Sequence, residues 1–244
     1  MNSKLFKMKN LLLFTVSIVL LLFVNCTGQD PNEFYEKAVE KFESGDDLGA
    51  IEYFNKVLEI DDKHAKAYFY RGSANFNLNN LEEAHSDFSK ALDIDSEFSD
   101  AYHDRAYVKH KLGNYNGAIK DYNKAIEYKP EFALAYLNMA GVKLDIKDIK
   151  GAIEDYNKAI EIEPDYALAH FNRGVAKYSL DDNEAALEDF SKAIKIDPTY
   201  ANAYFNRGFI RHQMGDKENG CTDMKKAVEL GLEGVNDVIK DLCE

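Results

Sequence analysis

Small, aromatic and polar residues alternate along this chain with the spacing of short amphipathic helices. The stretch from residue 167 to 200 reads ALAHFNRGVAKYSLDDNEAALEDFSKAIKIDPTY. Residues three, four and seven apart share a helical face, and Pro198 cannot continue a helix interior, so two short helices are predicted here. One such pair cannot bury its own apolar face, whereas stacked pairs can.

The same pattern returns at a constant interval without an insertion, which defines six consecutive units of equal length. The units span 31–64, 65–98, 99–132, 133–166, 167–200 and 201–234. The small position of the first helix is Ala38, Gly72, Ala106, Ala140, Gly174 and Gly208. The second helix carries the aromatic position Phe54, Phe88, Tyr122, Tyr156, Phe190 and, departing, Met224. Small residues let helices approach closely, and the aromatic ring fills the space between neighbouring pairs.

These in-phase copies resemble the tetratricopeptide repeat (TPR) family, over residues 31–234. The closing proline typical of that family is present at Pro130, Pro164 and Pro198. The resemblance implies an all-α, right-handed solenoid of six helix-turn-helix repeats. Polar turns inside each unit, such as Gly113-Asn114, are expected to supply left-handed or Asx-type conformations.

Residues 235–244 predict one further helix after the last repeat. Val235, Val238, Ile239 and Leu242 would lie on one face of it. Because the end of a solenoid exposes an apolar face, this helix is expected to cap the last repeat.

Residues 1–25 read as a signal peptide. Three lysines precede an apolar run at 11–24, which is shorter than the roughly 20 residues a spanning helix needs. Cys26 follows at once and resembles the lipobox of bacterial lipoproteins, which implies lipidation of Cys26 and a tether at 26–30. Lipoprotein signal peptides are cleaved just before this Cys, usually after a small residue. Asn25 is bulkier than that, so an uncleaved signal anchor and ordinary secretion stay open as alternatives.

Each of these alternatives places residues 27–244 outside the cytoplasm. We therefore expect a lipid-anchored protein of the bacterial cell envelope, at the outer membrane and facing the periplasm or the cell surface.

The net charge of -13 argues against nucleic acid as a partner, because an acidic body repels phosphate backbones. The chain carries no phosphate loop and no recognised nucleophile motif, so we expect neither an enzyme, nor a cofactor, nor a small-molecule substrate. His103 and His110 are two helical turns apart, about 10 Å, which is too far to share one metal ion without other ligands.

An arginine before the small position and an aspartate before the aromatic position recur together, at the same separation each time. The pairs are Arg71 with Asp87, Arg105 with Asp121, Arg173 with Asp189, and Arg207 with Asp223. We interpret them as structural ion pairs across each helix pair. An anion site built from the arginines is disfavoured, because each arginine has its own aspartate.

Cys221 and Cys243 fall on the last repeat and on the capping helix. An oxidising compartment permits a disulfide between them, which would hold the cap in place. Two small buried thiols are the alternative.

By resemblance to the family, the first helices line a concave groove with aromatic walls. The expected groove residues are Tyr35, Phe69, His103, Tyr107, Asn138, Phe171, Asn172, Phe205, Asn206 and Phe209. In the family, an Asn at the position of Asn138, Asn172 and Asn206 can bind a peptide backbone. The cations that grip a terminal carboxylate in chaperone-binding relatives are replaced here by Leu134, Leu168 and Asn202.

The sequence thus predicts a noncatalytic scaffold that holds a partner protein or peptide in its groove, in assembly of an envelope complex. Two other roles stay open: a self-assembling structural protein, and an accessory subunit of an envelope enzyme or secretion system.

Overall fold

The computed structural model describes residues 30–243, which form thirteen α-helices and no strand. The expected leader, its lipidation site Cys26 and nearly all of the tether lie outside the described residues. The first three repeats are the pairs α2 (Pro31–Glu43) with α3 (Asp47–Ile60), α4 (Ala65–Asn77) with α5 (Leu81–Ile94), and α6 (Ser99–Lys111) with α7 (Tyr115–Tyr128). The next three are α8 (Ala133–Asp145) with α9 (Ile149–Ile162), α10 (Ala167–Tyr178) with α11 (Asn183–Ile196), and α12 (Ala201–Gln213) with α13 (Lys217–Glu229).

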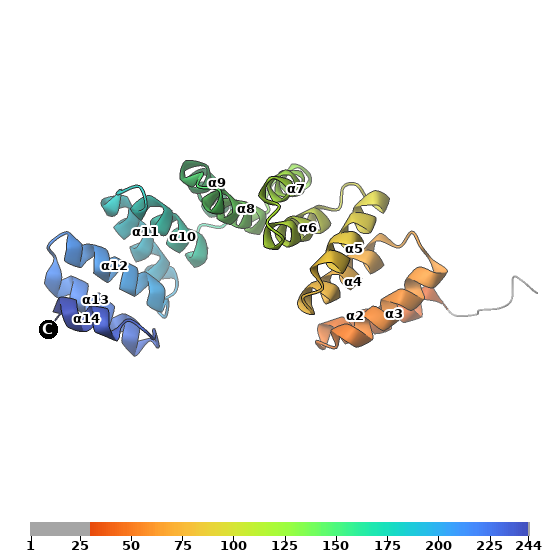
Figure 1. The fold of residues 1–244 in the computed structure, drawn as a ribbon, viewed down its shortest axis with the longest axis horizontal. Helices are drawn as coiled ribbons and strands as arrows, with labels where there is room; N and C mark the ends of the chain where they lie inside the picture. The colour runs from red at the N-terminus through yellow and green to blue at the C-terminus, as the bar shows by residue number, and fades with distance from the viewer. Residues whose placement is uncertain (1–29, 244) are drawn as a thin grey trace, which may run out of the picture.

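The six pairs follow one another as an arc, with α14 (Asn236–Cys243) beside α13 at its end (Figure 1). In the middle of the arc the first helices α6 and α8 lie toward its hollow, and the second helices α7 and α9 lie toward its outside. The prediction of an all-α helical repeat fold is confirmed.

The turn inside each repeat contains one residue in the left-handed region, as predicted. These residues are Gly45, Asn79, Gly113, Lys147, Asp181 and Gly215, with φ between 59° and 95°. A polar side chain then caps most of the second helices. In repeat four, for example, Asp148 Oδ1 accepts a hydrogen bond from the Gly151 backbone N–H at 3.0 Å. Short turns of this kind bring the two helices of a repeat together.

The core is a chain of small apolar clusters between successive helices. The small residues of the motif are fully buried, and the aromatic side chains of repeats one to five are at most 2% exposed. In repeat six Gly208 faces Gly220: a Cβ added to Gly208 would lie 2.6 Å from the Gly220 carbonyl oxygen. The last helix pair thus packs through close backbone contact, with Met224 in the place of the aromatic ring.

The capping helix α14 packs against α13 through Ile239, which is 8% exposed. A disulfide joins Cys221 of α13 to Cys243 of α14, with the Cα atoms 5.6 Å apart. His212 Nε2 adds a contact with the Leu242 carbonyl oxygen at 3.0 Å. Val238, expected on the inner face, is instead 38% exposed.

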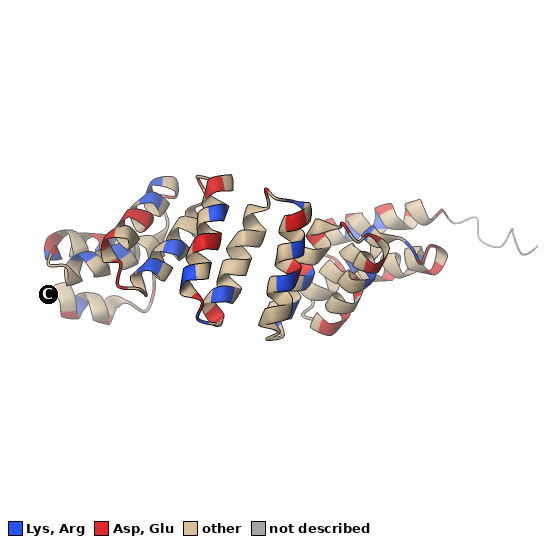
Figure 2. Ribbon diagram, turned by 90° about the horizontal axis from the view of Figure 1, so that it is seen from above, with Lys and Arg blue, Asp and Glu red and all other residues tan. Residues whose placement is uncertain are grey.

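Charges of both signs are interspersed along the helices (Figure 2). Among residues 30–243, no helix has the length and apolar character needed to cross a bilayer.

Candidate functional site: the concave groove

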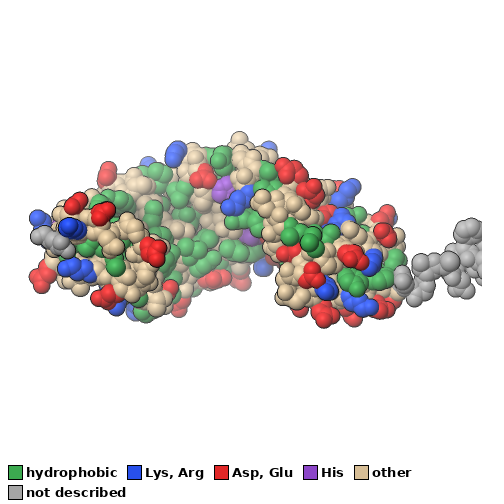
Figure 3. All heavy atoms as spheres, turned by 60° about the horizontal axis from the view of Figure 1, so that its bottom comes forward, with side chains coloured by type: hydrophobic (Ala, Val, Ile, Leu, Met, Phe, Trp, Pro, Cys, Tyr) green, Lys and Arg blue, Asp and Glu red, His purple; other side chains and the backbone are tan. Residues whose placement is uncertain are grey.

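The hollow of the arc holds a cavity of about 490 Å³ between repeats two and three, with contributions from repeats one and four. Figure 3 looks onto this face and shows hydrophobic side chains over much of its floor. The aromatic lining is Phe42, Phe76, Phe88 and Tyr107. The rest of the lining is Ser73, Asn77, His103, Asp104, Leu134 and Asn138. First helices of four consecutive repeats, together with Phe88 of the second helix α5, therefore build one open pocket.

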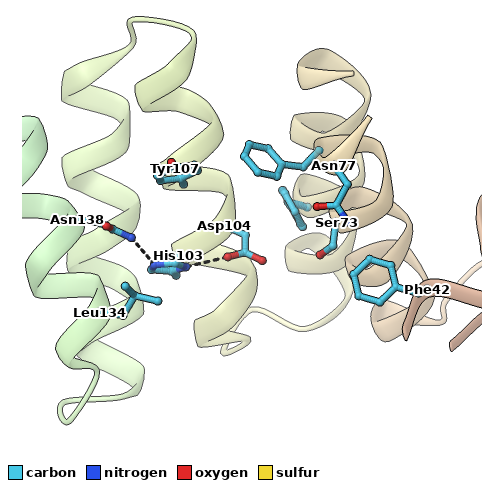
Figure 4. A pocket seen from close by; sticks show the side chains of 10 residues that line it. Phe42, Ser73, Asn77, His103, Asp104, Tyr107, Leu134 and Asn138 are labelled. Atoms are coloured by element: carbon cyan, nitrogen blue, oxygen red, sulfur yellow. Dashed lines mark hydrogen bonds and ion pairs between the residues drawn. The ribbon is translucent and has the colours of Figure 1, made fainter. Parts of the chain in front are cut away.

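A hydrogen-bonded chain of three residues crosses the floor of this pocket (Figure 4). His103 Nδ1 lies 2.8 Å from Asp104 Oδ1, and His103 Nε2 lies 3.0 Å from Asn138 Nδ2. The Asn138 amide can only donate from its nitrogen, so His103 accepts at Nε2 and donates from Nδ1 to Asp104. The His103 side chain is 9% exposed, and both of its ring nitrogens are occupied. It orients Asp104 and Asn138 and has no nitrogen left for a ligand.

A second cavity, about 130 Å³, lies between repeats five and six. Its lining is Val175, Tyr178, Phe190, Asn206, Phe209 and Ile210. It is smaller and carries no charged side chain. The groove thus has a larger pocket that contains a carboxylate in its N-terminal half and a smaller, uncharged pocket in its C-terminal half.

Five of the ten expected groove residues line these cavities: His103, Tyr107 and Asn138 the larger one, and Asn206 and Phe209 the smaller one. Asn172 is half-buried and lines neither cavity. Phe205 is also half-buried, and its ring stacks on Phe209 with centroids 6.3 Å apart.

Three expected groove rings are half-buried and pack against rings of neighbouring helices, and they line neither cavity. Phe171 contacts Phe190 and Tyr200, with ring centroids 5.6 and 4.9 Å apart. Phe69 contacts Phe88 and Phe98 in the same way, at 5.7 and 4.8 Å. The fifth position of the first helix points toward the following repeat, so its ring closes the junction.

Tyr35 is the third of these rings. It stacks on His64 with centroids 4.8 Å apart and packs edge-on against Phe54. Burial raises the pKa of Tyr35 to about 12, with a further contribution from Tyr70. The phenol therefore stays protonated at neutral pH and serves packing.

The arginine and aspartate pairs lie across the helix pairs of repeats two, three, five and six. Arg71, for example, donates from Nε and Nη2 to the two carboxylate oxygens of Asp87 at 2.9 and 2.6 Å. The same bidentate contact joins Arg105 to Asp121, Arg173 to Asp189, and Arg207 to Asp223. The aspartates are 3–6% exposed. Buried carboxylates need such partners, so these pairs are structural.

A second donor to each aspartate was missed by the sequence analysis. It stands four residues after the arginine, one helical turn on: Lys109, Lys177 and Arg211 contact Asp121, Asp189 and Asp223 at 2.6 to 2.9 Å. Asn75 takes this place in repeat two. The i, i+4 spacing in the sequence could have indicated this second donor, because it puts both donors on one helical face.

Repeat four lacks the arginine, since Met139 stands at its position. Asp155 keeps only the second cation, Lys143, at 2.6 Å. Burial raises the pKa of Asp155, and the Lys143 contact offsets this only in part.

Within residues 30–243 no three His, Cys, Asp or Glu side chains are placed to hold a metal ion. His110 contacts Asp145 at 2.6 Å.

Sequence profiles of known protein families match several stretches of the chain. The profile described as TPR repeat matches residues 106–146, 142–181 and 176–215, and profiles described as tetratricopeptide repeat match 65–98 and 201–230. The chain belongs to the tetratricopeptide repeat family. TPR proteins are typically noncatalytic protein-interaction scaffolds, and this TPR chain has the fold and the groove of one.

Solved TPR structures share this fold at low sequence identity. PilF of Pseudomonas aeruginosa is 15% identical with a TM-score of 0.75, covering 86% of this chain and 97% of PilF. YrrB, described as a TPR protein with an unusual peptide-binding site, is 22% identical with a TM-score of 0.64, covering 77% and 97%. MamA of Desulfovibrio magneticus RS-1 is 22% identical with a TM-score of 0.63, covering 69% and 95%. No curated protein matches the chain.

Proposed function

We propose that this TPR protein holds an extended segment of a partner protein in its concave groove. The observation that carries the proposal is the pocket of about 490 Å³, to which the inner helices α2, α4, α6 and α8 all contribute. A segment lying along the groove would meet aromatic faces for apolar burial and amide groups for hydrogen bonds to its backbone. The description of YrrB as a peptide-binding TPR protein supports this use of the fold.

A photo-crosslinking amino acid placed at single positions tests the proposal in living cells. Leu134 is suitable, because it lines the pocket and is 41% exposed. Lys90, exposed on the outer helix α5, is the matched control. We expect the Leu134 position to give one discrete adduct and the Lys90 position to give none. Equal adducts at both positions, or none at Leu134, would reject the groove as the binding surface.

We further propose that a lipid on Cys26 tethers the solenoid to the bacterial cell envelope, where it acts in assembly of an envelope complex. The lysines and apolar run before Cys26 support this, because they have the order of a lipoprotein leader. Cys26→Ser is expected to move the protein from the membrane to the soluble fraction. An unmodified protein that still begins at Met1, seen by intact mass, would reject lipidation.

A further inference from the structure

We propose that the pocket between α4 and α6 takes a positively charged side chain, arginine or lysine, from the segment bound in the groove. This inference rests on the proposed peptide binding and adds the chemistry of one partner residue. It assigns Asp104 as the anionic partner of that side chain.

The pocket carries one formal charge, and that charge is negative. Asp104 is the one Asp, Glu, Lys or Arg side chain among its lining residues, and the Nε2 atom of His103 faces the amide nitrogen of Asn138. The Asp104 side chain is 34% exposed, so it is accessible from the pocket although most of its surface is shielded from water. Lys111 contacts the Tyr107 ring, with Nζ 5.3 Å from the centroid, but it does not line the pocket.

The second oxygen of Asp104 is available. Oδ1 accepts from His103, and within the described residues Oδ2 accepts no hydrogen bond. Figure 4 shows the carboxylate pointing from α6 across the gap toward Ser73 and Asn77 of α4. Because His103 is itself held by Asn138, the carboxylate is fixed before any ligand arrives, which lowers the entropic cost of binding.

The other polar groups of the pocket offer acceptors as well. The Ser73 hydroxyl donates to the Phe69 carbonyl oxygen at 3.1 Å, and one hydrogen of Asn77 Nδ2 is used by Asp47 at 3.0 Å. The lone pairs of Ser73 Oγ and the Asn77 side-chain oxygen stay free among the described residues. An ammonium or guanidinium group carries several donors and no acceptor, so it matches this set.

Aromatic rings complete the fit. Phe42 and Tyr107 stand on opposite sides of the gap, and Phe76 packs edge-on against Tyr107 with centroids 5.5 Å apart. Such rings attract a cation over their faces and cover the aliphatic stem of lysine or arginine. A carboxylate in the same place would face Asp104 and lack a cationic partner. The geometry therefore selects a cation over an anion.

Small probes test the pocket without any partner. We would titrate the full chain in detergent with N-ethylguanidinium and with the neutral isostere N-ethylurea, and follow the side-chain amide resonances of Asn77 and Asn138 by NMR. Only the cation is expected to shift these resonances. Asp104→Asn, which keeps an oxygen for His103, should weaken the response roughly tenfold or more. Asp93→Asn, the same charge change on the exposed outer surface of α5, should not. Equal responses to both probes, or an unchanged response in Asp104→Asn, would overturn the proposal.

A peptide library separates this inference from the proposed function. Bead-bound decapeptide pools with Arg, Lys, citrulline or Glu fixed at one position would be probed with labelled full chain. Preferential retention on the Arg and Lys pools, lost in Asp104→Asn and kept in Asp93→Asn, supports the inference. Equal retention on all pools overturns it while leaving groove binding intact. Retention on none counts against the proposed peptide binding, and the inference falls with it.

Discussion

Arg173 donates two hydrogen bonds to Asp189, from Nε to Oδ2 at 2.9 Å and from Nη2 to Oδ1 at 2.5 Å. Its remaining nitrogen Nη1 donates to Asn157 Oδ1 at 2.6 Å. Asp189 is on α11 and Asn157 on α9, so one side chain of α10 joins three consecutive helices. The arginine therefore fixes both its own helix pair and the junction with the repeat before it.

Removing the charge of Asp189 should destabilise the protein far more than the same change at Asp155. Burial alone would raise the pKa of Asp189, but the hydrogen bonds from Arg173 and Lys177 outweigh it and hold the pKa below its ordinary value. Asp189→Asn leaves these cations without their buried partner, which should cost about 3 kcal/mol of unfolding free energy. Asp155→Asn removes a carboxylate that burial disfavours, so its effect should stay within about 1 kcal/mol. Urea denaturation at pH 7 measures both.

The two aspartates also predict opposite dependences on pH. The lowered pKa of Asp189 gives stability that is present above the unfolded pKa of about 3.9 and is lost as pH falls through the folded value. The raised pKa of Asp155 costs stability at neutral pH, and this cost disappears as pH falls through its folded value. The stability gap between the two Asn variants should therefore shrink between pH 7 and pH 3. A stability gap that is constant with pH would contradict the opposite pKa shifts of Asp189 and Asp155.

Met139→Arg should lower the pKa of Asp155. Met139 is 4% exposed and occupies the place of the repeated arginine, with Asn123 and Asp155 at the positions of that arginine's two partners. An arginine there would find the same two partners as Arg173, so unfolding free energy should rise by roughly 1 kcal/mol. NMR titration of the Asp155 carboxyl carbon and a melting curve measure the two effects. Met139→Leu keeps the apolar volume and should leave that pKa where it is.

Loss of the Cys221–Cys243 disulfide should release the capping helix. The bond closes a loop with a sequence separation of 22, and its removal by Cys243→Ser should cost about 3 kcal/mol. Hydrogen exchange should speed up in α14 and the end of α13 and stay slow in α4 to α9, because repeats depend mainly on their neighbours. Cys26→Ser changes the other cysteine and should leave this pattern intact. Uniform acceleration along the chain would show that the cap controls the whole solenoid.

Phe171→Ala should lower the thermal stability of the protein more than Phe205→Ala does. Phe171 lies between Phe190 and Tyr200. Because the Phe171 ring is half-buried, its removal should lower the free energy of unfolding by about 3 kcal/mol or somewhat less. Phe205 contacts Phe209 and belongs to no core cluster among the described residues, so its removal should change the melting temperature little. Thermal unfolding followed by circular dichroism decides between these outcomes, and equal losses would place both rings in the core.

Gly208→Ala should destabilise the last repeat, because the added Cβ would lie 2.6 Å from the Gly220 carbonyl oxygen. Backbone cannot move aside as a side chain can, so we expect a loss of about 1–3 kcal/mol. The matched change Gly141→Ala meets nothing within 4 Å and should stabilise α8 by about 0.5–1 kcal/mol. Denaturant unfolding of both variants is the measurement. A neutral Gly208→Ala would mean that α12 and α13 can separate without cost.

The sequence by itself determined the helices, their repetition along the chain, and the pairing of Arg173 with Asp189. All of these depend on local periodicity: helical spacing decides which residues share a face, and a repeat of constant length puts equivalent positions in equivalent places. The left-handed turns at Gly45, Asn79, Gly113 and Gly215 were predictable because Gly and Asn tolerate that conformation, whereas at Lys147 and Asp181 only the position within the repeat indicated it.

Only the tertiary structure decided which inner residues stay open to a ligand. Phe69, His103 and Phe171 occupy the same repeat position and make equivalent contacts at the repeat junction, yet of these three only His103 lines the larger cavity. The difference depends on the side chains that the next repeat supplies and on the angle at which it packs. Sequence spacing fixes neither, because a groove is formed between repeats and not within one.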